Sequence, residues 1–158
     1  MLGRGLAAAL FVAVADQLSK LWILALFAAR PGERVLPVAP FLNLALTWNR
    51  GMSFGLFNND ARLNAAIFTV LAAIIVAGLV VWLRRVGAGL LALAIGLVIG
   101  GALGNVVDRL WRGAVVDFLD FHVEGWHFYV FNLADAAISV GVGLMVLDSL
   151  LARAKAAN

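Results

Sequence analysis

Two aspartates, Asp117 and Asp135, are the residues of this chain best placed to carry out chemistry. They stand before and after Glu124-Gly125, in a segment that leaves one very apolar stretch and enters another. If the residues between them form a hairpin, both aspartates return to the same level at the edge of a membrane. Two carboxyl groups held together in a low dielectric cannot both ionise, so one acts as a base and the other as an acid. This pairing predicts amide hydrolysis by an intramembrane aspartyl peptidase, with no metal ion or cofactor.

Other chemistries remain open on these residues alone. The G-x-S-x-G pattern around Ser53 would allow a Ser/His intramembrane protease. A small proton-coupled transporter would also use intramembrane carboxylates, but it predicts acids spread along a path and repeat symmetry, whereas the chain has no internal repeat. In a non-catalytic membrane adaptor, Asp117 and Asp135 would be replaceable. His122 and His127 lie five apart in the expected hairpin, which predicts opposite strand faces and no metal site.

Further charged residues lie inside or next to apolar stretches, where charges are costly and are expected to pair or to support a site. Asp16 and Lys20 are four apart, hence on one helical face, and they either neutralise each other or support a site. Asp108-Arg109 follow directly on an apolar stretch and are expected to form an interfacial ion pair that marks its end, with a catalytic role, in which Arg109 braces a carboxylate or a substrate carbonyl, as the alternative. Asp120 is expected to be a solvent-exposed loop residue.

The composition places the chain in a membrane. Of its 158 residues, 64% are hydrophobic and 13% are charged, against about half and about a quarter in a soluble domain. The net charge of +3 comes from arginines and lysines at the ends of apolar runs, so we expect no nucleic-acid partner. The chain has no cysteine, which excludes thiol chemistry and disulfides. The length allows one domain, residues 1–158.

Four apolar stretches, approximately 5–27, 63–83, 86–107 and 131–151, are long enough to cross a membrane as helices. Because a helix satisfies its own backbone in lipid, they predict an all-α membrane protein with four transmembrane helices. An even number of spans puts both termini on one side, and the dense arginines beside the short inner segments favour the cytoplasm. The first stretch begins like a cleavable signal peptide, but its apolar pattern resumes beyond Lys20, so we expect it to be retained.

The two outer loops, approximately 30–62 and 110–130, are expected to carry the function. The sequence FLNLALTW at 41–48 alternates as a strand does, and residues 115–131 are rich in β-branched and aromatic types. We therefore expect small β elements in the two outer loops. Glycines recur every four residues from Gly96 to Gly104, which predicts close helix packing.

Five short motifs occur in order along the chain: DQLSK at 16–20, NRGMSFG at 49–55, GNVVDR at 104–109, VVDFLDF at 115–121 and FNLAD at 131–135. Together they resemble the lipoprotein signal peptidase (signal peptidase II) family over essentially the whole chain. The resemblance implies an aspartyl endopeptidase that removes the signal peptide from diacylglyceryl-modified prolipoproteins by cutting just before the lipidated cysteine. It implies that Asp117 and Asp135 are catalytic.

The resemblance also implies supporting or substrate-binding roles for a larger set of residues, namely Asp16, Lys20, Asn49, Gly51, Asn105, Asp108, Arg109, Asn132 and Ala134. It makes Ser53 incidental. The expected protein is a multi-pass monomer of the bacterial inner membrane with its active site near the outer face. Its expected partners are lipidated prolipoproteins and membrane lipid.

Overall fold

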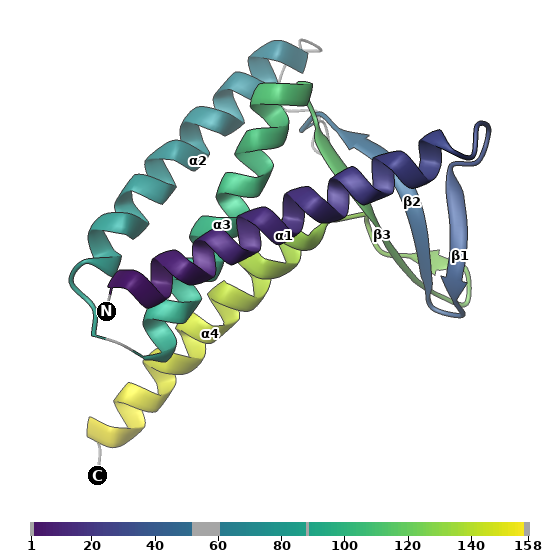
Figure 1. Ribbon diagram of the computed structural model, residues 1–158. Helices are drawn as coiled ribbons and strands as arrows, with labels where there is room; N and C mark the ends of the chain where they lie inside the picture. The colour runs from purple at the N-terminus through teal and green to yellow at the C-terminus, as the bar shows by residue number, and fades with distance from the viewer. Residues whose placement is uncertain (1, 52–60, 88, 157–158) are drawn as a thin grey trace.

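The computed structural model describes residues 2–51, 61–87 and 89–156 (Figure 1). Within them lie four helices, α1 (Leu2–Ala28), α2 (Ala61–Leu83), α3 (Leu90–Arg112) and α4 (Leu133–Ala156). Each contains a segment that is long and apolar enough to cross a membrane. The prediction of a membrane protein with four transmembrane helices is therefore confirmed.

The third helix differs from its expected bounds at both ends. It begins at Leu90 rather than at 86, after a connection that contains Gly89 with a φ of 155°. It continues past 107 to Arg112, and the N–H of Gly113 then bonds to the carbonyl of Arg109. The apolar pattern ends before the helix does because the last turns carry charges that find partners inside the protein.

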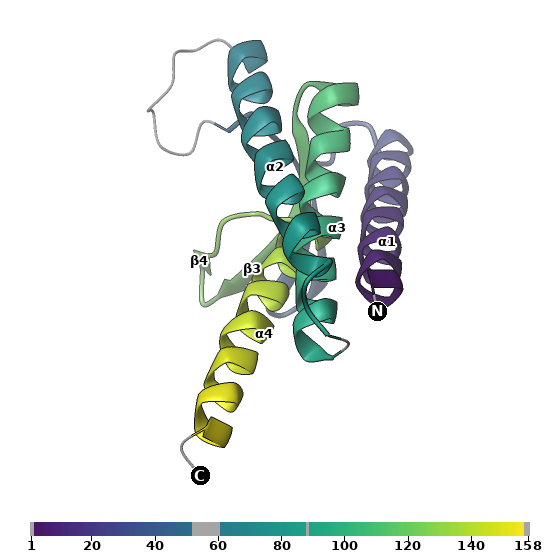
Figure 2. The ribbon, with the colours of Figure 1, turned by 90° about the vertical axis from the view of Figure 1, so that its left-hand side faces the viewer.

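Helix α3 is the centre of the bundle and packs against each of the other three helices (Figure 2). A Cβ added to Gly96 would lie 2.3 Å from the carbonyl oxygen of Gly5, and one added to Gly100 would lie 2.5 Å from that of Ala9. Both contacts are to the α1 backbone. The glycines at four-residue steps therefore let α1 and α3 approach closely, as predicted.

We expect Gly100→Ala to lower the thermal unfolding midpoint in detergent, because the new methyl group would force α1 away from α3. Overpacking of this kind costs about 1–3 kcal/mol. Gly143→Ala is the matched control, since nothing lies within 4 Å of a Cβ added there and glycine in a helix is about 0.5–1 kcal/mol worse than alanine. Equal midpoints for the two variants would contradict the close-packing role.

The two outer loops join in one antiparallel sheet. Its strands are β1 (Val35–Ala39), β2 (Leu42–Asn49), β3 (Val115–Val123) and β4 (Trp126–His127), in the order β1-β2-β3-β4. The predicted β elements are therefore present, and the pairing of β2 with β3 fuses them across the two loops. Partly buried leucines of the sheet pack with Phe118 against Ile23 and Phe27 of α1, which fixes the sheet to the bundle.

A two-residue turn joins β3 to β4. Glu124 and Gly125 have φ values of 48° and 83°, the left-handed geometry of a tight hairpin turn. His122 and His127 are thereby cross-strand partners, and their rings stack with centroids 5.0 Å apart. The prediction that they face opposite ways was wrong, because residues on either side of a two-residue turn oppose each other on one face.

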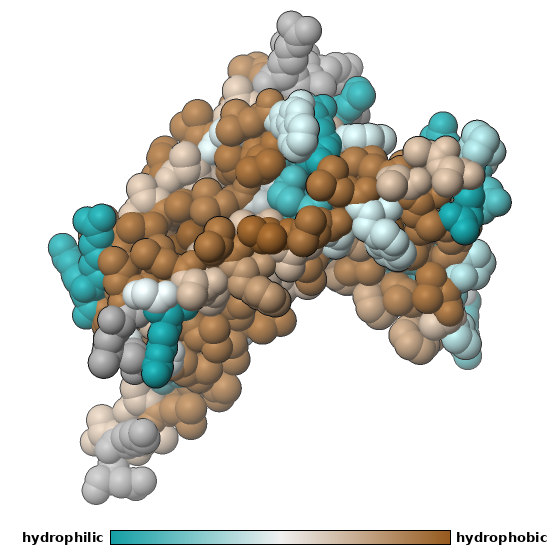
Figure 3. Space-filling view, viewed as in Figure 1, coloured by the Kyte–Doolittle hydropathy of each residue, from teal (hydrophilic) through white to brown (hydrophobic). Residues whose placement is uncertain are grey.

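The surface and the chain ends fit a membrane protein. Figure 3 shows apolar residues over the sides of the helices, with polar residues gathered at the ends of the bundle and over the sheet. In Figure 1, α1 begins and α4 ends on the side away from the sheet. Both termini therefore lie on one side, as four spans require.

Candidate active site

The hairpin returns the chain so that Asp117 and Asp135 share one cavity at the sheet end of the bundle. Asp117 is buried on β3, and Asp135 lies partly buried in the first turn of α4. The cavity has a volume of about 230 Å³. Its other lining residues are Asn49, Tyr129, Val130, Ile138 and Ser139.

Asn132 connects the two carboxyl groups. Its Nδ2 donates to Oδ1 of Asp117 at 2.6 Å, and its Oδ1 accepts from the backbone N–H of Asp135 at 3.0 Å. In return, the backbone N–H of Asn132 donates to Oδ2 of Asp135 at 3.3 Å. This reciprocal pair is a capping box at the start of α4, which satisfies backbone donors that a helix end leaves free. The local signal that begins the helix therefore also positions both aspartates.

Two further asparagines contact the pair from other elements. Asn105 of α3 donates from Nδ2 to Oδ1 of Asp135 at 2.8 Å, and Asn49 of β2 donates from Nδ2 to Oδ2 of Asp117 at 3.0 Å. Asn49 is held in turn by Gly51, whose N–H donates to Asn49 Oδ1 at 2.9 Å. Gly51 has a φ of 79° and lies so close to Phe68 that a Cβ would sit 2.3 Å from its ring. Only glycine fits this turn.

The surroundings of Asp117 raise its pKa above the ordinary value of 3.8. Burial raises the pKa of Asp117 to about 6, against the opposing hydrogen bond from Asn49. That value also includes an upward effect of the negative charge of Asp135 and downward effects of the hydrogen bond from Asn132 and the positive charge of Lys20. Two carboxyl groups with different environments in one cavity are suited to act as an acid and a base.

Behind this cavity lies a buried charge cluster centred on Lys20. Its Nζ contacts Oδ2 of Asp16 at 2.8 Å, Oδ2 of Asp108 at 2.8 Å and Oδ1 of Asn105 at 3.1 Å. The three donors of the ammonium group thus meet three acceptors. The pairing of Asp16 with Lys20 is as predicted. Asn105 connects this pair to the candidate site, because it contacts both Lys20 and Asp135.

The predicted ion pair between Asp108 and Arg109 was wrong. Both residues lie inside α3, where neighbours project about 100° apart. Asp108 instead pairs with Lys20 and with Arg112, one turn further on. Arg109 projects to another face, where its Nη1 donates to the carbonyl of Asn105 at 3.4 Å and its guanidinium lies 5.4 Å from the centroid of Phe68.

The backbone of Ala134 joins the cluster to α4. Its N–H donates to Oδ1 of Asp16 at 3.0 Å. All nine expected supporting residues therefore lie in or next to one of two groups, the hydrogen bonds around Asp117 and Asp135 or the charge cluster around Lys20. Their functional roles stay predictions.

Two members of the cluster, Gln17 and Arg112, were not among the predicted site residues. Gln17 Nε2 donates to Oδ1 of Asp108 at 3.1 Å and to the carbonyl of Gly104 at 3.0 Å, and its Oε1 accepts from Arg112 at 3.1 Å. An amide inside an apolar span is a signal of the same kind as Asp16 and Lys20. It could have identified Gln17.

Asp120 was predicted to be solvent-exposed, and this was wrong. It is buried beneath the hairpin, accepts from Asn43 Nδ2 at 3.0 Å and contacts His127 Nδ1 at 2.8 Å. Burial alone would raise the pKa of Asp120, but the hydrogen bonds from Asn43 and His127 outweigh it and lower the pKa. Asp120 thus fixes the hairpin that carries Asp117.

Ser53, the nucleophile of the alternative Ser/His chemistry, lies outside the described residues. Within the described ranges, no group of three or more His, Asp or Glu side chains is arranged to hold a metal ion.

Known proteins match this chain over most of its length. A family model described as signal peptidase (SPase) II matches residues 8–151. A protein named lipoprotein signal peptidase from Methylorubrum extorquens (strain PA1) is 46% identical over 149 residues, which cover 92% of this chain and 85% of the relative. One of the same name from Shewanella loihica (strain ATCC BAA-1088 / PV-4) is 48% identical over 146 residues, covering 91% and 84%.

Two solved structures, each described as a bacterial membrane enzyme structure obtained by the in meso method, have TM-scores of 0.77 to this chain. They are 32% and 31% identical to it, and the matches cover 94% of this chain and 88% and 93% of theirs. The sequence and the fold therefore agree. This multi-pass membrane protein belongs to the signal peptidase II family of proteases.

Proposed function

We propose that this protein removes the signal peptide from diacylglyceryl-modified prolipoproteins, cutting just before the lipidated cysteine, with Asp117 and Asp135 as its catalytic residues. Relatives over nine tenths of the chain are named lipoprotein signal peptidase, which supports the substrate class. The observation that carries the aspartyl mechanism is that these two carboxyl groups line one cavity and both accept hydrogen bonds from Asn132, Asp117 from its Nδ2 and Asp135 from its backbone N–H.

In this mechanism Asp135 is the base and Asp117 is the acid. Asp135 is partly exposed and accepts N–H donors on both of its oxygens, from Asn105 Nδ2 and from the backbone of Asn132. The pKa of Asp117, raised to about 6, lets this carboxyl group keep its proton to a higher pH than an ordinary aspartic acid. Asp135 takes a proton from a water molecule while the oxygen of that water bonds to the scissile carbonyl carbon. At the same time Asp117 donates a proton to the carbonyl oxygen. When the C–N bond breaks, the nitrogen receives the proton held by Asp135 and Asp117 regains its own, so both residues return to their starting forms.

The position of the cavity suits a lipid-anchored substrate. The cavity lies where α4 begins and β3 enters the sheet, at the end of the membrane-spanning helices. A substrate held in the bilayer by its diacylglyceryl chains would present its scissile bond at this depth, so proximity replaces affinity from solution. We propose that this end faces the outside of a bacterial inner membrane and that both termini are cytoplasmic.

The decisive experiment compares two versions of one precursor in proteoliposomes that contain the purified protein. We expect cleavage of the diacylglyceryl-modified precursor before its lipidated cysteine, and at least about tenfold slower cleavage of the unlipidated twin, because binding energy from a remote anchor is spent at the reacting bond. Mass spectrometry of the products locates the cut. Equal turnover of the two would disprove the lipid-anchor argument, and cleavage at another bond would disprove the assigned position.

A further inference from the structure

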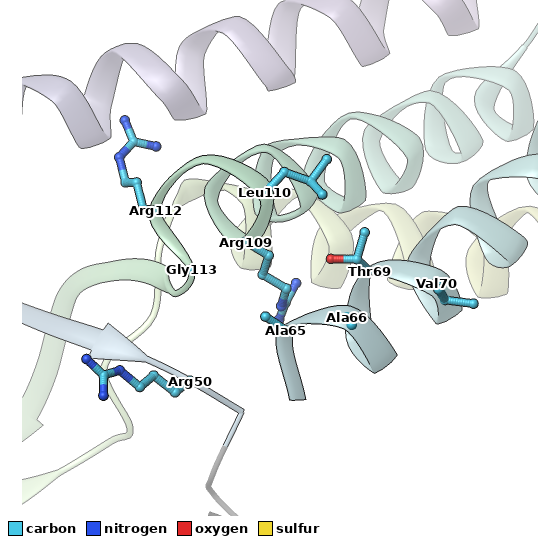
Figure 4. Close-up of a pocket in the computed structure, with 9 residues that line it drawn as sticks. All are labelled: Arg50, Ala65, Ala66, Thr69, Val70, Arg109, Leu110, Arg112 and Gly113. Carbon is cyan, nitrogen blue, oxygen red and sulfur yellow. The ribbon is translucent and has the colours of Figure 1, made fainter. Parts of the chain in front are cut away.

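A cavity of about 610 Å³ opens between the sheet-side ends of α2 and α3 (Figure 4). Its walls are mainly apolar, from Ala65, Ala66 and Val70 of α2 and Leu110 of α3. Its charged lining residues are all arginines, and no carboxylate lines it among the described residues. A cavity that is apolar along its walls and positive at its rim is suited to an amphiphile with an anionic head.

Arg109 supplies the guanidinium inside this cavity. Figure 4 shows its side chain directed toward α2, with the hydroxyl of Thr69 pointing toward it. Phe68 and the carbonyl of Asn105 are its close contacts. In the described part of the chain no carboxylate lies within ion-pair distance of Arg109. Within the described ranges the guanidinium donates to the carbonyl of Asn105 and to no other group, which leaves most of its five N–H donors available to a ligand there.

The other two arginines differ from each other. Arg112 is turned toward α1, where Asp108 and Gln17 bind it, so its charge is already neutralised. Arg50 lies at the opposite rim, just after β2, and is exposed with its side chain directed outward. No described residue forms a hydrogen bond or an ion pair with it, so its long side chain can turn over the mouth. Among the described residues, Arg50 and Arg109 are thus the two arginines of the cavity that form no ion pair, although the charges of Asp135, Asp117 and Asp108 act on Arg109 from a greater distance.

The residues beside the mouth place it at the level of lipid head groups. Leu110 is 72% exposed and Trp111 is 71% exposed at the end of α3. The Arg112 guanidinium lies 4.8 Å from the Trp111 ring centroid. Exposed tryptophan together with arginine at the end of a spanning helix is typical of the membrane–water interface. The phosphates of the surrounding lipids lie at this depth.

We propose that this cavity binds the phosphodiester head group of an anionic membrane phospholipid. Arg109 and Arg50 contact the phosphate oxygens, since guanidinium groups match phosphate geometry, and the Thr69 hydroxyl donates a further hydrogen bond. One acyl chain follows the apolar wall past Ala66 and Val70. Arg109 also lines a second cavity of about 310 Å³ that contains Asn105 and Asp135. The lipid therefore lies next to the candidate active site but outside it.

The test is native mass spectrometry of the full chain in detergent, titrated with dioleoylphosphatidylglycerol or with dioleoylphosphatidylcholine. We expect one saturable site that prefers phosphatidylglycerol by about fivefold, the effect of one unit charge at a membrane surface. Arg50→Gln and Arg109→Gln should each reduce that affinity by about the same factor. Ala66→Phe keeps every charge but fills the cavity, so it should abolish the saturable site.

Two matched controls define the alternatives. Arg84→Gln removes an exposed arginine at the other end of the bundle, and Ala73→Phe adds the same ring on an exposed part of α2 outside the cavity. Both should bind phosphatidylglycerol as the parent protein does. Equal affinity for the two lipids, or equal losses in Arg50→Gln and Arg84→Gln, would overturn the proposal. The experiment measures lipid binding without cleavage. A failure of the lipid-site proposal can therefore be told apart from a failure of the proposed function.

Discussion

Replacing either Asp117 or Asp135 with asparagine is expected to abolish cleavage of a lipidated precursor, with at least about a 10³-fold loss in kcat/KM. An asparagine carboxamide can neither take a proton from water nor donate one as a carboxylic acid does, and proton transfer by a positioned group contributes about 10²–10⁴-fold. Asp117 and Asp135 carry out two proton transfers of the same reaction, so the loss of either one disables the pair. The double variant should therefore be no slower than the slower of the two single variants. Turnover by the purified variants in proteoliposomes measures the effect.

Protein abundance should stay near normal in Asp117→Asn. The folded protein holds the Asp117 proton up to a pKa of about 6, whereas the ordinary value is 3.8. Stability therefore falls as the pH rises from about 4 to about 6, and above that range the ionised Asp117 is a cost to folding. Asp117→Asn removes this cost to folding and weakens one of the hydrogen bonds that the side chain at 117 accepts. Asp148→Asn, the same change far along α4, is the activity control. Retained turnover in either dyad variant, with Asp148→Asn normal, would refute the aspartyl mechanism.

Lys20→Met is expected to destabilise the protein by about 3–5 kcal/mol and to reduce its abundance sharply. The Lys20 ammonium is fully buried, and its removal leaves Asp16 and Asp108 with one partner fewer in an environment that water does not reach. In the parent protein the buried cluster is balanced, since the charges of Lys20 and Arg112 offset those of Asp16 and Asp108. The thermal midpoint in detergent and the amount of protein in membranes measure the loss.

A double variant separates charge imbalance from lost packing. Lys20→Met combined with Asp108→Asn restores a balanced cluster, so it should be more stable than Lys20→Met alone although it carries one more substitution. If the double variant were the less stable of the two, the cost of Lys20→Met would lie in packing, and the electrostatic account of the cluster would fail.

The sequence predicted those features that depend on local patterns. Apolar length gave the four spans, the turn at Glu124-Gly125 gave the hairpin, and the hairpin gave the meeting of Asp117 with Asp135. These features follow from spacing along a continuous segment, which a single sequence contains in full.

Features that join distant segments were missed. The pairing of Thr47 with Asp117 fuses the two outer loops, and it depends on strand partners that no local pattern specifies. The same holds for Asp120, which looks exposed in the hairpin until Asn43 of β2 covers it. The error for Asp108 came from the expected end of the third helix. That helix was expected to end at 107, before the charge of Asp108, but Lys20 of α1 neutralises this charge and α3 continues past it.

The capping box at Asn132 has a consequence for how this protein gains and loses activity. Asp135 cannot take up its working orientation until the first turn of α4 has wound, and that turn is incomplete until Asn132 and Asp135 engage each other. In the proposed mechanism, fraying of this one helix end below the unfolding temperature of the bundle would therefore inactivate the enzyme. Inactivation on heating should accordingly precede global unfolding.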